Sequence, residues 1–266
     1  DKSENQAPTR ETPPVSNEIS KETKREIKKM AVNLNNYEKG AKLGEGSFGK
    51  VYKITEKETG KIYCAKISKK VIEDNTFEDL LNLLTEVSLF SKFDHPSIVQ
   101  FIGYSTINFN NEPKPVIIME YSPNGSLQQA IKLEYYSRAI SEWDDTHKLI
   151  NIYGLASAMA YLHRHNILHR DLKTENILLD DYLFPKVSDF GLSTISSSES
   201  TQSMIFDHGS NFVCGTPIYM SPEIIKEHKY TKAGDVYSFS LIVYEIMTMT
   251  APFNELHSFI EIIKKV

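Results

Sequence analysis

The sequence has few cysteines, little net charge and no long apolar run, and each of these absences excludes a class of protein. Two cysteines among 266 residues, Cys64 and Cys214, exclude a disulfide framework and are typical of a reducing compartment, so we expect a cytoplasmic or nuclear location. The formal net charge of -5 argues against binding to nucleic acid by bulk electrostatics. The longest apolar run, residues 239–249, is too short to cross a bilayer and contains Glu245, so it predicts a buried helix.

The first 36 residues are polar, contain several prolines and show no signal-peptide pattern. They cannot bury enough apolar surface to fold alone, so we expect residues 1–36 to be a disordered tail. Within it, Ile27, Met30, Ala31 and Leu34 recur at helical spacing. This spacing predicts a short helix that docks on the neighbouring lobe or frays in solvent, with a partner-binding segment as the alternative.

The rest of the chain changes from a strand-like to a helical pattern near residues 122–126, which predicts a boundary between two lobes. The overall composition, 40% hydrophobic and 24% charged, is that of a soluble protein with a large core. Beyond the boundary we expect helices at residues 127–133 and 147–165. The buried side of the second would be formed by Leu149, Ile152, Leu155, Ala156, Met159 and Leu162.

Before the boundary, a period of two from Tyr37 predicts three antiparallel strands. The first two flank a G-x-G-x-x-G-x-V array. Glycines there let backbone N–H groups approach phosphate oxygens that a side chain would keep away. A purely structural hairpin is the alternative, whereas a dinucleotide-binding fold would need a helix after the last glycine, where residues 51–54 predict a strand.

The densest group of chemically useful residues lies between His169 and Gly191. Asp171 can accept a proton from a hydroxyl, while Asn176 and Asp189 offer the hard oxygen ligands that Mg²⁺ prefers. A plain surface hairpin is the alternative interpretation, but these residue types rarely meet at such spacings by chance.

Together these motifs resemble the catalytic loop, the Asp-Phe-Gly motif and the glycine-rich loop of eukaryotic protein kinases. The resemblance covers residues 37–266. It implies an α+β fold with two lobes: a small antiparallel sheet with one main helix at residues 37–122, and a larger, mainly helical lobe at residues 123–266. It also implies ATP and Mg²⁺ as cofactors and phosphoryl transfer to serine or threonine hydroxyls of protein substrates in signalling. The sequence of residues 235–239, Asp-Val-Tyr-Ser-Phe, most resembles that of the tyrosine-kinase-like group.

The resemblance gives each polar residue of the catalytic loop a role. Asp171 would orient and deprotonate the substrate hydroxyl, and Lys173 would neutralise the transferring phosphoryl group. Asn176 and Asp189 would hold Mg²⁺. Asp235 would hold the catalytic-loop backbone from below, although an aspartate that caps its own helix is the alternative.

The resemblance also assigns a nucleotide site. Lys66 would hold the α and β phosphates of ATP, and Glu86, on a helix expected at residues 77–92, would be its ion-pair partner. The remaining residues implied to contact ATP are Leu43, Gly44, Glu45, Gly46, Ser47, Phe48, Gly49, Val51, Cys64, Met119, Glu120, Ser122 and Leu178. Cys64 replaces the usual alanine above the adenine, and we expect it to be a small buried hydrophobe.

Residues 193–210 are rich in serine and threonine and lie where kinases have an activation loop, although the composition alone also fits a flexible linker. An upstream kinase or the chain itself would phosphorylate this segment, and the phosphate would pair with Arg170. The resemblance also implies packing of His169 and Phe190 with Phe90 and Phe101. His163 and His165 lie on different helix faces, so no metal role is expected for them.

The family's pattern contains several more helices beyond residue 253, so we expect a C-terminally truncated catalytic domain and an incomplete large lobe. The first residue is Asp rather than Met, which also suggests a piece of a longer protein. The rival interpretation is therefore a kinase-like nucleotide-binding or scaffold module that is inactive.

Overall fold

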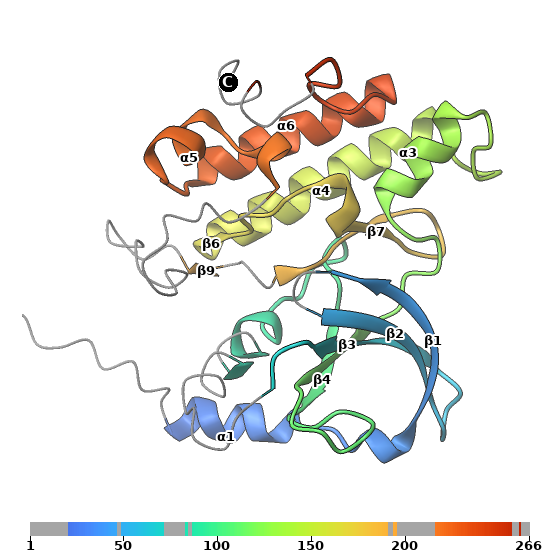
Figure 1. The fold of residues 1–266 in the computed structure, drawn as a ribbon, viewed down its shortest axis with the longest axis vertical. Coiled ribbons are helices and arrows are strands. Elements are labelled where there is room, and N and C mark those ends of the chain that lie inside the picture. Colours follow the sequence, from blue (N-terminus) through green and yellow to red (C-terminus); the bar gives the residue numbers. More distant parts are fainter. Residues whose placement is uncertain are drawn as a thin grey trace, which may run out of the picture.

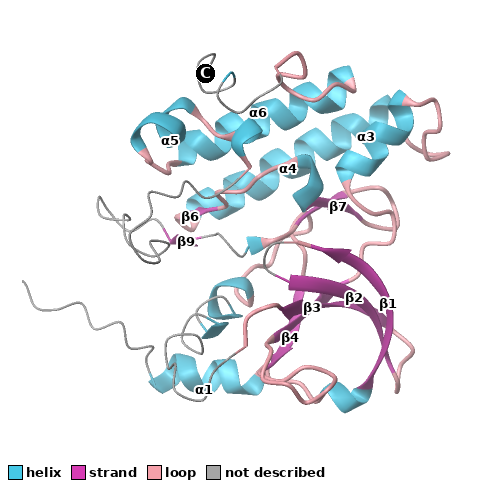
Figure 2. Ribbon diagram, in the orientation of Figure 1, coloured by secondary structure: helices cyan, strands magenta, loops and turns pink. Residues whose placement is uncertain are grey.

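The computed structural model describes residues 21–46, 49–71, 83–84, 87–190, 194–195, 216–256 and 261, and the structural statements below concern these residues. They form a sheet lobe and a helical lobe, joined near the predicted boundary (Figures 1 and 2). This is the two-lobed α+β architecture that the sequence predicted. Among the described helices, none is both long and apolar enough to cross a bilayer.

The sheet lobe contains five antiparallel strands in the order β1-β2-β3-β5-β4. Their bounds are β1 Tyr37–Glu45, β2 Gly49–Glu56, β3 Ile62–Ser68, β4 Phe101–Ser105 and β5 Val116–Glu120. The three strands predicted from the period-two pattern are β1 to β3. The register places Val51 opposite Lys66, and Cys64 opposite Met119. Residues predicted to contact ATP are therefore neighbours across three adjacent strands.

The structure corrects the expectation that all of residues 1–36 form a disordered tail. Residues 21–36 contain α1 (Lys21–Lys29) and a 3-10 turn, η1 (Leu34–Asn36). Ile27 is 2% exposed and Leu34 is buried as well, so this segment buries enough apolar surface to dock on the sheet lobe. Residues 1–20 lie outside the described residues.

The helical lobe begins with α3 (Leu127–Tyr135), whose first turn is held by a capping box between Ser126 and Gln129. The other helices are α4 (Asp145–Arg164), α5 (Pro222–Glu227) and α6 (Lys232–Thr248), with 3-10 turns η2 (Thr174–Asn176) and η4 (Pro217–Tyr219). Two short antiparallel pairs join β6 (Ile167–Leu168) to β9 (Thr194–Ile195), and β7 (Ile177–Leu179) to β8 (Pro185–Val187). Figure 1 shows α4 beside α6, with the β7 and β8 hairpin between α4 and the sheet lobe.

The predicted buried side of α4 is confirmed at Leu155, Met159 and Leu162, but Leu149 is 63% exposed and Ala156 is exposed as well. The buried face also contains polar side chains that find partners. Lys148 pairs with Glu134 at 2.5 Å, and the amide nitrogen of Asn151 donates to the carbonyl of Leu183 at 2.8 Å. Polar residues near the start of α4 are therefore buried together with its apolar side, because their polar groups have partners.

Candidate active site

Asp171 lies in the loop between β6 and η2, at the centre of a network of hydrogen bonds. Its Oδ1 accepts from the backbone N and from the hydroxyl of Thr216, both at 3.0 Å. Lys173 Nζ lies 3.0 Å from Asp171 Oδ2 and also donates to the Thr216 hydroxyl at 2.7 Å. A hydroxyl group is therefore held between a carboxylate and an ammonium group, as a general base and an electrostatic stabiliser require.

Asn176 and Asp189 are brought together through Ser188. The backbone oxygen of Asn176 accepts from the backbone N and the hydroxyl of Ser188, at 2.8 and 2.9 Å. The amide nitrogen of Asn176 donates to the Asp171 backbone oxygen at 2.7 Å and to its carboxylate at 3.1 Å. The amide nitrogen is thus used within the loop, which leaves the amide oxygen as the group of Asn176 that would bind a metal. No group of three or more His, Cys, Asp or Glu residues that suits a metal occurs in the described part of the chain. The donor set fits Mg²⁺, which takes few protein oxygens and completes its shell with water and phosphate.

Lys66 reaches across from β3 and pairs with Asp189, with 2.5 Å between Nζ and Oδ1. Burial alone would raise the pKa of Asp189, but the charge and hydrogen bond of Lys66 outweigh burial and hold this pKa below its usual value. Asp189 is therefore ionised at neutral pH, as a metal ligand must be. Glu86, the predicted partner of Lys66, lies outside the described residues.

The glycine-rich array divides into two kinds of position. A Cβ at Gly49 would lie 2.5 Å from the backbone oxygen of Ile67, so packing against β3 excludes a side chain there. At Gly44 and Gly46 a Cβ would meet no described atom within 4 Å. Packing within the chain therefore does not explain these two glycines, and the space beside them can admit a ligand. The Gly46 backbone N is itself used within the loop, where it donates to the Gly49 oxygen at 2.9 Å. Ser47 and Phe48 lie outside the described residues.

The other residues predicted to contact ATP occupy neighbouring positions. Cys64 and Met119 are buried, Leu43 is 45% exposed, and Leu178 forms a β-bridge with Ser126. The Glu120 carboxylate is engaged elsewhere: Lys186 lies 3.2 Å from Oε1, which also accepts from the backbone N of Gln100 at 2.9 Å. The resemblance implies contacts of ATP with the backbone of Glu120 and of the buried Ser122, and the Glu120 backbone N already donates to the Gln100 oxygen at 3.0 Å.

Asp235 fixes the catalytic loop from the N-terminal part of α6. Its Oδ2 accepts from the backbone N of His169 and its Oδ1 from that of Arg170, both at 3.0 Å. This confirms the contact that the resemblance implied. His163 Nε2 lies 3.0 Å from Asp235 Oδ2, so it is a positioning residue that the sequence did not reveal. The two residues are far apart in the chain, and no motif connects them.

Aromatic rings link the catalytic loop to the sheet lobe. The ring centroid of Phe190 lies 5.2 Å from that of His169 and 5.3 Å from that of Phe90, while Phe90 lies 5.6 Å from Phe101. These are the four residues that the resemblance implied. Phe93, 4.7 Å from Phe190, was not predicted. The stack positions the residue that directly follows Asp189.

Arg170 adopts a left-handed backbone conformation, with φ of 68°. Its guanidinium carbon lies 4.9 Å above the ring centroid of Tyr230, a cation–π arrangement. The strain of this conformation is offset by the hydrogen bond from the Arg170 backbone N to Asp235. The Arg170 side chain is thereby directed toward the loop that precedes α6.

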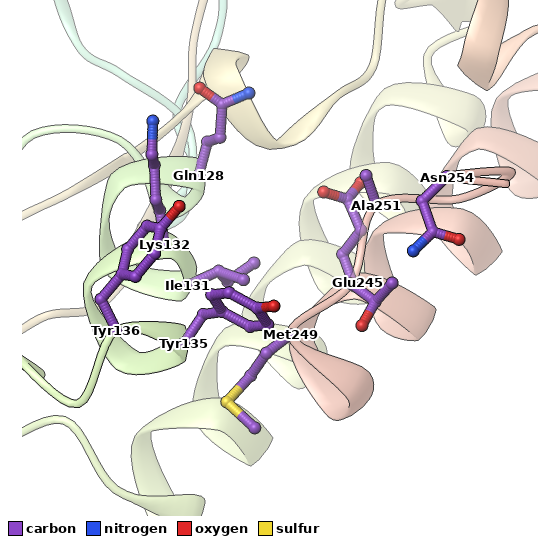
Figure 3. A pocket seen from close by; sticks show the side chains of 10 residues that line it. Gln128, Ile131, Lys132, Tyr135, Tyr136, Glu245, Met249, Ala251 and Asn254 are labelled. Carbon is purple, nitrogen blue, oxygen red and sulfur yellow. The ribbon is translucent and has the colours of Figure 1, made fainter. Parts of the chain in front are cut away.

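A buried carboxylate lies beside the catalytic loop. Glu245 is 5% exposed, its Oε1 accepts from the Tyr219 hydroxyl at 2.5 Å, and the Tyr219 hydroxyl is 3.0 Å from that of Thr174. Glu245 also lines a hollow of about 350 Å³ between α3 and the end of α6, which Figure 3 shows with Tyr135 and Tyr136 on its α3 side. Burial raises the pKa of Glu245 to about 7, and the nearby charge of Glu175 adds to this effect.

The raised pKa of Glu245 predicts a pH-dependent stability. Between its ordinary pKa of 4.5 and about 7, the folded chain retains a proton that the unfolded chain has lost, so this group's contribution to stability falls as pH rises through that window. Since one pKa unit corresponds to about 1.4 kcal/mol, the loss is on the order of 3 kcal/mol. The free energy of unfolding, measured in urea, should decrease less from pH 5 to pH 8 in Glu245→Gln than in the wild type. The exposed Glu142→Gln should behave like the wild type. Equal pH dependence in Glu245→Gln and the wild type would contradict the prediction.

Comparison with known proteins agrees with this geometry. Residues 37–266 match the family described as protein kinase domain. An Aurora kinase of Saccharomyces cerevisiae is 31% identical over 243 residues, which cover 91% of this chain and 60% of that protein. The probable serine/threonine-protein kinase nek1 of Dictyostelium discoideum is 31% identical over 245 residues, covering 86% of this chain and 47% of that protein. NUAK family SNF1-like kinase 1 of Homo sapiens is 34% identical over 220 residues, covering 82% of this chain and 30% of that protein.

The chain thus spans 60% or less of the length of each of these relatives. The family match covers the sheet lobe, the catalytic loop and α6, and so includes every residue of the site. Sequence, fold and site geometry lead to the same assignment. This chain belongs to the protein kinase domain family.

Proposed function

We propose that this chain transfers the γ-phosphoryl group of ATP to serine or threonine hydroxyls of protein substrates. One observation carries the proposal: Asp171 and Lys173 together hold the hydroxyl of Thr216, at 3.0 and 2.7 Å. A substrate hydroxyl bound at the same place would meet a carboxylate that can take its proton and an ammonium group that can stabilise negative charge.

Each residue has a separate task in this mechanism. Asp171 accepts the hydroxyl proton as the oxygen attacks the γ-phosphorus, and Lys173 stabilises the charge on the transferring group. Asn176 and Asp189 would hold Mg²⁺, which neutralises phosphate charge when bound. Lys66, now paired with Asp189, is placed to hold phosphate oxygens, and the absence of a Cβ at Gly44 and Gly46 leaves space for phosphate beside the loop.

Specificity for serine and threonine rests first on Lys173 and Thr216, a pair that resembles the serine/threonine branch of the family and that is in contact here. It rests also on the names of the relatives, one of which is a probable serine/threonine-protein kinase. The test is incubation of the full chain with γ-³²P-labelled ATP, Mg²⁺ and a generic basic protein, followed by phosphoamino acid analysis. We expect label in phosphoserine and phosphothreonine. Label mainly in phosphotyrosine would contradict the specificity, and no label would contradict the activity.

Regulation by phosphorylation of residues 193–210 belongs to the same proposal, although residues 196–210 lie outside the described residues. The support is Arg170, whose half-buried guanidinium points toward the loop before α6. Combined alanine replacement of Ser200, Thr201, Ser203 and Ser210 should lower the rate of phosphoryl transfer by tenfold or more, on the scale of one or two charge-assisted hydrogen bonds. The rate would be measured after incubation of both proteins with Mg²⁺ and ATP. An unchanged rate would refute this regulation.

Three further assignments remain proposals. Membership of the tyrosine-kinase-like group rests on the similarity of the sequence of residues 235–239 to that group. Additional chain that completes the helical lobe is supported by exposed apolar side chains on α4 and α6, namely Leu149, Tyr153, Tyr244 and Met247. A cytoplasmic or nuclear location and a role in signalling rest on the few cysteines and on the family.

A further inference from the structure

The outer edge of β4 is covered by residues 27–34, which we call the N-terminal strap. β4 is the last strand of the sheet, so one side of it has no neighbouring strand. The Val32 N donates to the Tyr104 oxygen at 2.9 Å, the Tyr104 N donates to the Met30 oxygen at 3.1 Å, and Ala31 forms a parallel bridge with Tyr104. The strap thereby satisfies both backbone groups of Tyr104 at an otherwise open edge.

The strap also places apolar side chains on both faces of the sheet. Ile27 belongs to the core cluster that contains Val87 and Phe90, on the helix side. Leu34 belongs to the second cluster, with Ile118, on the opposite side. Figure 1 shows α1, which leads into the strap, lying across the end of the sheet lobe near β4. The strap is outside the region matched by the family, which begins at residue 37.

Gly103 allows the close approach of the strap to β4. A Cβ at this position would lie 2.4 Å from Val32 Cγ1 and 2.9 Å from the Met30 backbone oxygen. Because one of these contacts is with backbone, a side chain cannot be accommodated by a rotamer change alone. Gly103→Ala therefore displaces the strap while it removes no core side chain.

The elements that hold the strap also support the aromatic stack. Phe101 is the first residue of β4, and its ring lies 5.6 Å from that of Phe90, which belongs to the same cluster as Ile27. Phe90 in turn lies 5.3 Å from Phe190, the residue after Asp189. A continuous set of packed residues thus runs from the strap to the metal-binding motif.

We propose that the N-terminal strap is a positioning element for phosphoryl transfer. By fixing β4 and the helix around Phe90, it holds Phe190, and with it Asp189, in the geometry that pairs with Lys66. The surface formed by the β4 edge and the neighbouring apolar cluster is thus a docking site whose occupant is residues 27–34 of the same chain. This inference rests on the proposed phosphotransfer activity.

The test compares four variants of the full chain: Gly103→Ala and Ile27→Asp displace the strap, whereas Ile27→Val and the exposed Glu26→Ala leave it seated. The values of kcat and KM for ATP and a peptide would be measured well below each melting temperature. Since misplacement by about 1 Å can cost roughly 100-fold in rate, we expect kcat to fall about 10- to 100-fold in the displaced variants. The KM values of the displaced variants should change by no more than about twofold, which is small beside the expected loss in kcat. The kcat and KM values of the two control variants should also stay within about twofold of the wild type. A melting temperature that falls while kcat stays unchanged would overturn the proposal, because it would reduce the strap to a stabilising role.

Hydrogen exchange gives a readout that does not depend on activity. In Gly103→Ala we expect faster exchange of the amides of Tyr104, Asp189 and Phe190 than in the wild type. Unchanged exchange at Asp189 and Phe190 would overturn the coupling, even if Ile27→Asp failed to fold. If the wild type transferred no phosphate but Gly103→Ala still showed faster exchange at Asp189 and Phe190, the proposed function would fail while the structural inference stood.

Discussion

Replacement of Asp171 by asparagine is expected to lower kcat for phosphoryl transfer by about 10²- to 10⁴-fold, the usual contribution of a positioned general base. An amide oxygen can still accept the hydrogen bonds that Thr216 donates to Oδ1, so the loop should keep its shape. An amide cannot take a proton from an attacking hydroxyl, and it removes the charge beside Lys173. The measurement is single-turnover transfer of ³²P from ATP to a peptide.

The matched control for this prediction is Asp181→Asn, which makes the same chemical change at an exposed position in the turn between β7 and β8. Its kcat should equal that of the wild type. Nucleotide affinity and melting temperature should be preserved in both variants. An Asp171→Asn protein within tenfold of wild-type kcat would remove Asp171 from the role of base.

Asp189→Asn is expected to abolish the stabilisation that Mg²⁺ and ATP give to the folded chain. At a ligand concentration 100 times Kd, binding stabilises a protein by about 2.7 kcal/mol, which is several degrees in melting temperature. The substitution removes the carboxylate that is proposed to hold Mg²⁺ and that pairs with Lys66. We therefore expect the wild type, but not the variant, to show a thermal shift with ATP that depends on Mg²⁺.

The arms of that experiment separate metal binding from nucleotide binding. Adding EDTA should reduce the shift of the wild type to that seen with ATP alone. Asp181→Asn should retain the full shift, because its carboxylate is exposed in the turn between β7 and β8. An undiminished Mg²⁺-dependent shift in Asp189→Asn would show that this carboxylate does not hold the metal.

Much of the site was predictable because its residues are concentrated in one stretch of the chain. Asp171, Asn176 and Asp189 lie within 169–191, so one short stretch carried the resemblance to protein kinases that implied metal-assisted phosphoryl transfer. The strands also followed from the period-two pattern. In β3, for example, alternate side chains belong to the two core clusters, so each face of the strand packs against a different cluster. Local patterns of this kind need no knowledge of long-range packing.

The contacts that could not be predicted join residues distant in sequence. His163 reaches Asp235 across two helices, and nothing near either residue marks the pair. The buried side of α4 includes Lys148 and Asn151, polar residues that a hydrophobic pattern assigns to the surface. Partners such as Glu134 and Leu183 become apparent only when helices and hairpin are packed together.

The buried position of Cys64 has a consequence for chemical labelling. The side chain is 6% exposed in β3, opposite Met119, and burial raises the pKa of its thiol to about 11. At pH 7 only about one molecule in 10⁴ would then carry the reactive thiolate. Iodoacetamide and similar electrophiles should therefore spare this cysteine in the native protein and modify it after denaturation. Inhibitors designed to bond covalently to a cysteine above the adenine would meet a poor nucleophile at Cys64.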